Sequence, residues 1–335
     1  MPLKLTTYYH GKDIPDNLPG TDTFHSKELF LVYEATPGYI PLLIVATDNG
    51  RPMARMLAVS RKAKRWLPAI LSRQCMVYGS GEMLDASLLG VEHKLQAEAV
   101  FEQILEQLTR EALRTCVFIE FRNLAVPMFG YRPFRANGYF PVNWLRVRNS
   151  LHGALAVEER FSPSRSRQIK KGLQSGAVVR EAVTSDEVRG FARMLRGAYS
   201  TRVRRHFPSG EFFRQLHTRL APEGHSKIFI VVHKERVIGG AACLYSDREA
   251  YLWFSGGMRK TYALQYPGVL AVWKALDDAY HHGYEHLEFM DVGLPFRKHG
   301  YREFVLRFGG KQSSTRRWFK VRWAWLNKLL EKFYV

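Results

Sequence analysis

The order of elements along this chain is repeated. Residues 42–59 and residues 228–244 each read as an apolar run, a polar turn carrying an arginine, and a second apolar run that opens with small residues. The turns Asp48-Asn49-Gly50 and His233-Lys234-Glu235 are typical of β-hairpins. A repeated hairpin of this kind predicts two similar units in tandem.

Each predicted hairpin is followed by a third strand, a long one-sided helix and a fourth strand. In the first half we expect the third strand at residues 74–78, the helix at 93–113 and the fourth strand at 115–121; in the second half we expect them at 250–254, 267–282 and 286–290. The apolar face of the first helix is predicted to comprise Leu95, Ala99, Ile104, Leu108 and Leu113. At 335 residues the chain exceeds a usual single core. The sequence predicts an α/β (α+β) fold of two domains, residues 1–155 and 156–335, each a mixed, mostly antiparallel sheet flanked by helices.

The charge balance limits the classes of partner. Lys and Arg total 50 against 31 for Asp and Glu, a net charge of +19, which favours a polyanion, an anionic membrane or a phosphorylated substrate. Cys75, Cys116 and Cys243 are widely spaced, with no C-x-x-C, so we expect buried reduced thiols and a cytosolic protein rather than a disulfide or zinc framework. We expect neither a secretory signal nor a membrane span.

A basic helix is predicted between the two halves. Ser162 suits the N-cap, Pro163 the first helical position, and Gly176 the C-terminal end. The cations of this segment are Arg165, Arg167, Lys170 and Lys171, and further arginines follow at positions 189, 193, 196, 202, 204 and 205. Two neighbouring cationic helices favour an anion-binding surface, against the alternative of a solvated basic face.

The segment from Glu288 to Lys311 carries the candidate catalytic chemistry. An apolar strand ends at Asp291 and leads into a Gly/Pro loop, a basic patch and a Phe-x-x-x-Phe-Gly-Gly element. Such a segment can supply a proton acceptor, a proton donor and an anion-binding patch. The candidates are Asp291, then Glu288, as the carboxylate, Tyr301 as a proton donor, His299 as an alternative base, and Arg297, Lys298 and Arg307 as diphosphate ligands. No metal-ligand pattern is found, and Ser255-Gly256-Gly257 is typical of a turn.

The β-β-β-α-β unit is the core of GNAT-type acyltransferases, and two in tandem resemble the FemABX peptidyltransferase family and its acetyltransferase-like relatives. The similar segments are 119–126 and 137–145 in the first half, 164–181 between the halves, and 283–293 with 301–311 in the second. The resemblance implies a cytoplasmic acyl- or aminoacyltransferase that modifies an amine of a cell-envelope precursor, of peptidoglycan or exopolysaccharide type. It also implies a cleft between two GNAT-like domains, with Arg165, Arg167, Lys170, Lys171, Phe304, Phe308 and Lys311 near the substrate.

Two departures bear on the acyl donor. The family's Phe-Lys pair becomes Phe304-Val305, so we expect Arg307, two residues further along a strand, to replace the lysine. The long helical arm of some tRNA-using members has no counterpart between Gly176 and Lys227. Residues 265–270 partly match a GNAT pyrophosphate turn, with Gln265 and Gly268 as candidate ligands and Arg259 and Lys260 nearby. We expect no tightly bound cofactor, with acyl-CoA and aminoacyl-tRNA both open as donors and the first domain binding the acceptor.

The C-terminal segment alternates aromatic and basic residues. Residues 316–323 read as a strand and residues 325–334 as a short helix. An anchor on the inner face of a membrane is one interpretation, suited to a lipid-linked or nucleotide-linked phosphorylated acceptor. A packing helix is the other. A small-molecule or sugar-amine N-acyltransferase and a non-enzymatic nucleic-acid binder remain alternative functions, the latter without a recognised RNA- or DNA-binding motif.

Overall fold

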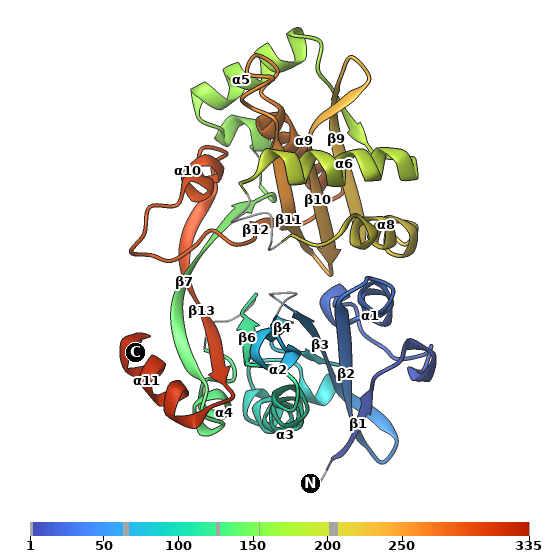
Figure 1. Ribbon diagram of the computed structural model, residues 1–335, viewed down its shortest axis with the longest axis vertical. Helices are drawn as coiled ribbons and strands as arrows, with labels where there is room; N and C mark the ends of the chain where they lie inside the picture. The colour runs from blue at the N-terminus through green and yellow to red at the C-terminus, as the bar shows by residue number, and fades with distance from the viewer. Residues whose placement is uncertain (1–2, 63–66, 125–127, 154, 201–206, 335) are drawn as a thin grey trace. The chain divides into compact units, whose positions relative to one another are not determined.

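The computed structural model describes residues 3–62, 67–124, 128–153, 155–200 and 207–334, which fall into two compact units (Figure 1). The first unit comprises residues 1–144 and 315–335, and the second comprises residues 145–314. The sequence placed the boundary after residue 155 and residues 315–335 in the second domain. The structure groups that segment with the first unit because strand β13 pairs there with β6.

The first unit holds a sheet in the order β1-β2-β3-β4-β6-β13, antiparallel except where β4 runs parallel to β6. Its strands are β1 (Lys4–Tyr8), β2 (Tyr39–Asp48), β3 (Arg51–Lys62), β4 (Arg73–Tyr78), β5 (Glu82–Met83), β6 (Phe118–Arg122) and β13 (Lys311–Val321). Its helices are α1 (Lys27–Glu34), α2 (Ala69–Ser72), α3 (Lys94–Leu113), α4 (Tyr131–Ala136) and α11 (Ala324–Tyr334). β7 (Phe140–Ser150) and β13 each pass from one unit into the other.

The predicted β2–β3 hairpin is present, with Asn49 and Gly50 both at positive φ as a two-residue hairpin turn requires. Helix α3 packs on the sheet through residues spaced three and four apart. Its buried face comprises Ala97, Val100, Phe101, Ile104, Leu105, Leu108, Thr109 and Ala112. The helix starts where it was predicted, but its buried face was predicted wrongly near that end: Leu95 and Ala99 are exposed, whereas Ala97 and Val100 are buried.

The second unit holds a sheet in the order β7-β12-β11-β10-β9-β8. Its further strands are β8 (Val178–Glu181), β9 (Ser226–His233), β10 (Arg236–Ser246), β11 (Glu249–Gly257) and β12 (His286–Phe289). Its helices are α5 (Pro163–Gln174), α6 (Ser185–Ala198), α8 (Gly210–Arg219), α9 (Pro267–His281) and α10 (Gly300–Leu306). The second hairpin turns at Lys234 and Glu235, also at positive φ. The repeated β-β-β-α-β order is therefore confirmed.

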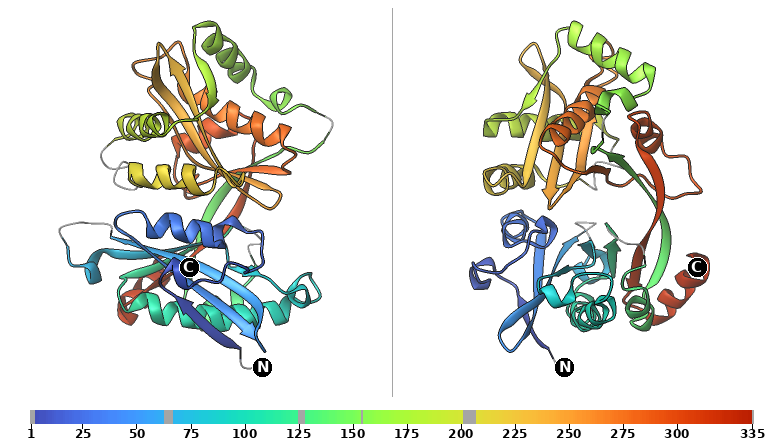
Figure 2. Two further views of the ribbon diagram at one scale, coloured as in Figure 1. Left: turned by 90° about the vertical axis from the view of Figure 1, so that its right-hand side faces the viewer. Right: turned by 180° about the vertical axis from the view of Figure 1, so that it is seen from behind.

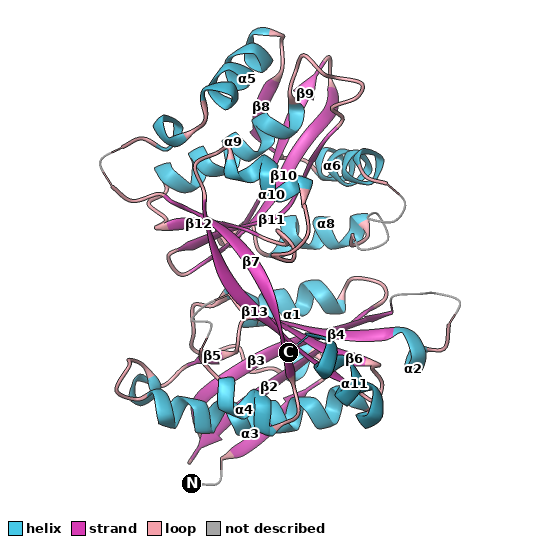
Figure 3. Cartoon of the chain, turned by 90° about the vertical axis from the view of Figure 1, so that its left-hand side faces the viewer, coloured by secondary structure: helices cyan, strands magenta, loops and turns pink. Residues whose placement is uncertain are grey.

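Helices cover both faces of the second sheet, with α9 on one face and α6 and α8 on the other (Figures 2 and 3). Strand β10 shows how alternation produces this arrangement. Ala241 and Cys243 belong to the core that α9 completes, whereas a Cβ on Gly240 would lie 2.6 Å from the ring of Phe191 in α6. Because both faces are covered, β10 reads as an almost continuous apolar run.

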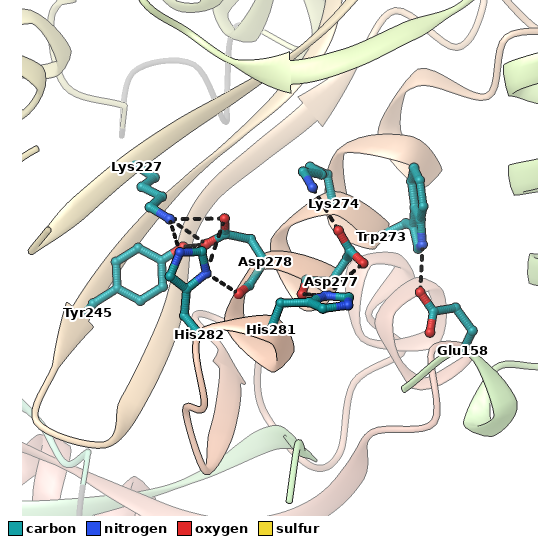
Figure 4. A network of polar contacts seen from close by, with 9 residues as sticks. All are labelled: Glu158, Lys227, Tyr245, Trp273, Lys274, Asp277, Asp278, His281 and His282. Carbon is teal, nitrogen blue, oxygen red and sulfur yellow. Dashed lines mark hydrogen bonds and ion pairs between the residues drawn. The ribbon is translucent and has the colours of Figure 1, made fainter. Parts of the chain in front are cut away.

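A polar network holds the second half of α9 against β9 and β10 (Figure 4). The buried carboxylate of Asp278 accepts hydrogen bonds from Lys227 Nζ, at 3.0 Å to each oxygen, and from the Tyr245 hydroxyl at 2.9 Å. His282 Nε2 lies 3.2 Å from the same Nζ. This network fixes the helix, and with it the start of α9 at the other end.

Two further expectations can be compared with the structure. Cys75, Cys116 and Cys243 are buried and unpaired, as predicted. Among the described residues, no helix has both the length and the apolar character that crossing a bilayer requires. Arg202, Arg204 and Arg205, and residues 125–126 of the segment similar to the FemABX family, lie outside the described ranges.

Candidate active site

Strands β11 and β12 part at the centre of the second unit. They pair in parallel from Glu249 opposite His286 to Leu252 opposite Phe289. β12 ends there, whereas β11 continues to Gly257 and keeps its pairing with β10 on the other side. Within the described sheet, residues 253–257 thus have no strand partner on the side of β12. A parallel pair that opens in this way leaves backbone groups available to a ligand.

Glycines let the start of α9 approach the strand ends beside this opening. A Cβ on Gly257 would lie 2.4 Å from the amide nitrogen of Gly268, and one on Gly239 would lie 2.7 Å from the carbonyl oxygen of Pro267. Neither position tolerates a side chain without moving the helix. Residues 255–257 are therefore part of strand β11, and the prediction of a turn at Ser255-Gly256-Gly257 was wrong.

The start of α9 offers few donors for an anion. Pro267 has no N–H, and the amides of Val269 and Leu270 both donate to the carbonyl of Tyr266, at 2.9 and 3.1 Å. Of the first-turn amides, Gly268 alone makes no hydrogen bond recorded within the described residues. The candidate ligands Gln265 and Gly268 thus lie at a helix start, as predicted, but form a poorer anion site than a turn with several free amides. Arg259 and Lys260 are exposed beside it.

Residues 300–306 form helix α10, so the expectation of a strand there was wrong. The apolar positions recur every three or four residues: Val305 and Phe308 are fully buried, and Tyr301 and Phe304 partly so. The expected replacement of the family's lysine by Arg307 required a strand, in which Arg307 would lie two residues along from Val305. Because the segment is helical, this argument fails. Arg307 is the exposed C-cap residue of α10.

Arg165 is a buried cation between α5 and α10, 4% exposed. Its guanidinium carbon lies 4.2 Å from the centroid of the Phe304 ring and 4.9 Å from that of Phe308. One nitrogen donates to the carbonyl of Phe304 at 2.9 Å and another to the side chain of Gln168 at 2.6 Å, while Nε is buried with no hydrogen-bond partner in the described part of the chain. Burial, and then the charge of Arg307, lower the pKa of Arg165 to about 10.

No ion pair found among the described residues involves either Arg165 or Arg307. A buried guanidinium beside a second cation is costly unless an anion joins them. The other cations of α5 are placed differently: Arg167, Lys170 and Lys171 are exposed, while Ile169 and Gly172 face inward. Sequence reasoning therefore found the basic helix but did not separate Arg165 from its neighbours. Ser162 lies at the N-cap as predicted, although its side chain makes no capping hydrogen bond.

Tyr301 lies between the ring of Phe304 and the opening between strands β11 and β12. Its ring stacks with Phe304 at 6.4 Å between centroids, and the side chain of Ser255 in β11 lies close enough to its hydroxyl to influence its pKa. Burial raises the pKa of Tyr301, and the side chain of Ser255 opposes this. Because its hydroxyl stays protonated at neutral pH, Tyr301 can act as a hydrogen-bond donor.

Asp291 lies two residues beyond the end of β12 and is exposed, in the left-handed conformation with φ 62°. Its charge acts on Tyr301 and on His299. Burial and the charge of Arg302 lower the pKa of His299 against the opposing effect of Asp291, so its imidazole is neutral at pH 7. Asp291 therefore acts electrostatically on one proton donor, Tyr301, and on one neutral base, His299.

Glu288 lies on the other face of β12 from this group. It is 4% exposed and forms an ion pair with Arg146 of β7. Burial raises the pKa of Glu288 to about 7, against the lowering effect of Arg146 and Arg148. A carboxylate paired inside the sheet is poorly placed to meet a substrate amine, which argues for a structural role.

The remaining candidates separate into two groups. Arg297, Lys298 and Lys311 are exposed, and Phe308 is buried beneath Arg165. Sequence reasoning missed Ser255 and also Tyr199, which follows α6 and donates its hydroxyl to the carbonyl of Ser255 at 2.6 Å. The sequence did carry a signal for the region around Ser255 and Tyr199. It has glycine pairs at 239–240 and 256–257, which lie opposite one another on the neighbouring strands β10 and β11.

Three features of this chain define the tandem GNAT fold. They are a parallel strand pair that opens, a helix start held close to the strand ends by glycines, and two β-β-β-α-β units in tandem. A model of an acetyltransferase (GNAT) domain matches residues 164–298, so this segment is similar to GNAT domains. The chain is similar to the crystal structure of FemX, with a TM-score of 0.62 at 12% identity over 95% of each chain.

Two other solved structures are similar over nearly the full length. A tandem GNAT protein from the clavulanic acid biosynthesis pathway gives a TM-score of 0.54 at 13% identity, covering 96% of this chain and 99% of that one. The C-terminal domain of a putative lysylphosphatidylglycerol synthetase from Agrobacterium fabrum gives 0.55 at 10% identity, covering 93% and 91%. No curated protein sequence matches significantly. The fold and the domain match support an acyltransferase.

Proposed function

We propose that this protein transfers an acyl or aminoacyl group to an amine of a phosphorylated cell-envelope precursor, of peptidoglycan or exopolysaccharide type. The observation that carries the proposal is Arg165, a buried guanidinium with an unsatisfied Nε and no carboxylate partner in the described ranges. It lies in one continuous series of contacts with Phe304, Tyr301 and the end of β11.

The charge arrangement favours a phosphorylated substrate. Arg165 and Arg307 act on one another as like charges, and a phosphate would compensate both. Guanidinium groups bind phosphate oxygens in a bidentate manner. The exposed cations of α5, Arg167, Lys170 and Lys171, would then attract the anion before it reaches Arg165. The net charge of +19 agrees with this role.

The residues at the split supply the acid–base chemistry. Asp291, or neutral His299, accepts the proton that an ammonium group must lose before its nitrogen attacks the acyl carbonyl carbon. The new C–N bond forms as the carbonyl oxygen becomes an oxyanion, and the hydroxyl of Tyr301 can donate to that oxygen or to the leaving group. The intermediate then collapses, and the bond from carbon to the thiolate or ribose oxygen of the donor breaks.

Two donors remain in competition, and neither is a tightly bound cofactor. The likeness of fold to FemX and to lysylphosphatidylglycerol synthetases agrees with an aminoacyl-tRNA donor. The GNAT domain match and the open strand pair agree with acyl-CoA and a small-molecule or sugar-amine acceptor. The start of α9, with few free amides, weakens the acyl-CoA alternative because a diphosphate would find few backbone donors there.

A ligand screen with a matched variant tests the proposal. Purified protein and R165M are heated with acetyl-CoA, longer acyl-CoAs, charged and uncharged tRNA, and nucleotide-linked envelope precursors. A ligand at a hundred times its dissociation constant stabilises the folded protein by about 2.7 kcal/mol. We expect a shift with a precursor that R165M loses, and formation of an amide when precursor and the correct donor are combined.

Two outcomes would contradict the proposal. The first is a precursor that shifts the wild type and R165M equally, which would remove Arg165 from the site. The second is stabilisation by any RNA, charged or uncharged, with a steep salt dependence and no amide product, which would favour a non-enzymatic nucleic-acid binder.

A further inference from the structure

Helix α11 presents a stripe of apolar side chains to solvent. Trp325, Leu329 and Phe333 recur at every fourth residue, so they form one stripe along the helix. Their exposed fractions are 69%, 45% and 76%. An amphipathic helix of a globular protein ordinarily turns such a stripe toward the core. Here the stripe is exposed. The helix that carries it, α11, lies at the C-terminal end of the chain (Figure 1).

Other side chains of α11 hold it to the first unit, among them Asn327, Glu331 and Tyr334, whose ring stacks on Phe140. Asn327 is buried, accepts a hydrogen bond from the amide of Val321 at 2.8 Å and donates to the carbonyl of Gly138 at 2.9 Å. Glu331 pairs with Arg135 at 2.5 Å. These contacts fix the rotation of the helix about its axis, so the outward position of the apolar stripe is built into the fold rather than left to a loose tail.

Two lysines lie beside the stripe. Lys328 and Lys332 are exposed and four residues apart, on the side of the helix next to Trp325 and Leu329. Among the described residues, no ion pair includes either lysine. A Trp/Leu/Phe stripe bordered by lysines is the composition of helices that lie in the plane of a membrane interface, with aromatic rings at headgroup depth and ammonium groups on anionic lipid.

We propose that α11 docks this protein on the surface of an anionic bilayer, with Trp325, Leu329 and Phe333 inserted between headgroups. Charge complementarity selects this occupant over two others. A second copy of a chain with a net charge of +19 would bring like charges together at the same face. A nucleic acid would satisfy the lysines but would gain little from Leu329, which has no ring for base stacking.

Vesicle sedimentation tests this docking without any assay of activity. The full chain is mixed with vesicles of phosphatidylcholine alone or with phosphatidylglycerol added. We expect binding only to the anionic vesicles, weakened by salt. L329E and F333E should each lower the partition coefficient on the order of tenfold, because each removes apolar burial and adds a negative charge. K328Q and K332Q should lower it about fivefold each.

Matched variants separate this helix from general surface charge. L95E makes the same change at an exposed leucine of α3, and K4Q/K12Q removes two exposed lysines elsewhere in the first unit. Both controls should bind as the wild type does. Equal binding by L329E and the wild type would overturn the proposal, as would a wild type that binds no vesicles. A dimer in sedimentation velocity that L329E dissociates would assign the stripe to a second copy instead.

Discussion

The guanidinium of Arg165 lies over the ring of Phe304, 4.2 Å from its centroid, and donates a hydrogen bond to the carbonyl of the same residue at 2.9 Å. The two residues are 139 positions apart in the chain, on α5 and α10. Arg165 lacks a carboxylate partner among the described residues. The contact places its charge next to the stacked rings of Phe304 and Tyr301. It is the feature on which the functional proposal depends most.

Arg165→Met should separate activity from stability. Replacing a buried unpaired charge by an apolar side chain of similar length is often neutral or stabilising, so we expect the free energy of unfolding to change by no more than about 1 kcal/mol. Loss of a charged hydrogen-bond donor to substrate should lower kcat/KM between roughly tenfold and a hundredfold. Urea unfolding and steady-state kinetics measure the two effects.

Arg167→Met is the control for this variant, because Arg167 is on the same helix but exposed. It should leave the stability unchanged and reduce kcat/KM only slightly, more at low salt than at high salt. Equal losses of activity in R165M and R167M would mean that the charge of α5 acts as a whole and that the burial of Arg165 has no special role.

Asp291→Asn should lower turnover without loss of fold. Asparagine tolerates the left-handed conformation of residue 291, so stability should be preserved, whereas its amide cannot accept a proton from the substrate. We expect kcat to fall on the order of a hundredfold. D291A should in addition lose about 1 kcal/mol of stability, because alanine is strained at this φ. An unchanged kcat in D291N would leave His299 as the base.

Asp278→Ala should destabilise the second unit by about 3 kcal/mol, since it leaves the ammonium of Lys227 and the hydroxyl of Tyr245 without their shared partner (Figure 4). Asp277→Ala at the preceding position removes a less buried pair with Lys274 and should cost about 1 kcal/mol or less. Urea denaturation of both variants provides the comparison. Similar losses in the two would show that the buried network contributes nothing beyond a surface pair.

Glu288 should make stability depend on pH. Its pKa is raised from 4.5 in an unfolded chain to about 7 in the fold, so between these values the native state retains a proton that the unfolded state has lost. The associated stability is present below about pH 4.5 and is lost as the pH rises toward 7. Relative to E288Q, the wild type should lose on the order of 3 kcal/mol across this window. Parallel pH profiles of the two proteins would show that Arg146 holds Glu288 ionised throughout.

The sequence by itself determined the local order of elements in this protein. Turn residues such as Asn49 and Gly50 set the hairpins, and apolar periodicity set the long helices α3 and α9, because backbone conformation and side-chain alternation are local properties. The resemblance of this order to tandem GNAT proteins followed. The glycine pairs of β10 and β11 were visible as well, although their purpose was not.

Only the tertiary structure decided which side of each element meets a neighbour. It buried Arg165 and left Arg167 and Lys170 in solvent, and it made residues 300–306 a helix, because both depend on the packing of α10 against α5 and α9. It placed residues 315–335 with the first unit through the pairing of β13 with β6. It also turned the apolar stripe of α11 outward, since the contacts of Asn327 with residues far away in the chain fix that rotation.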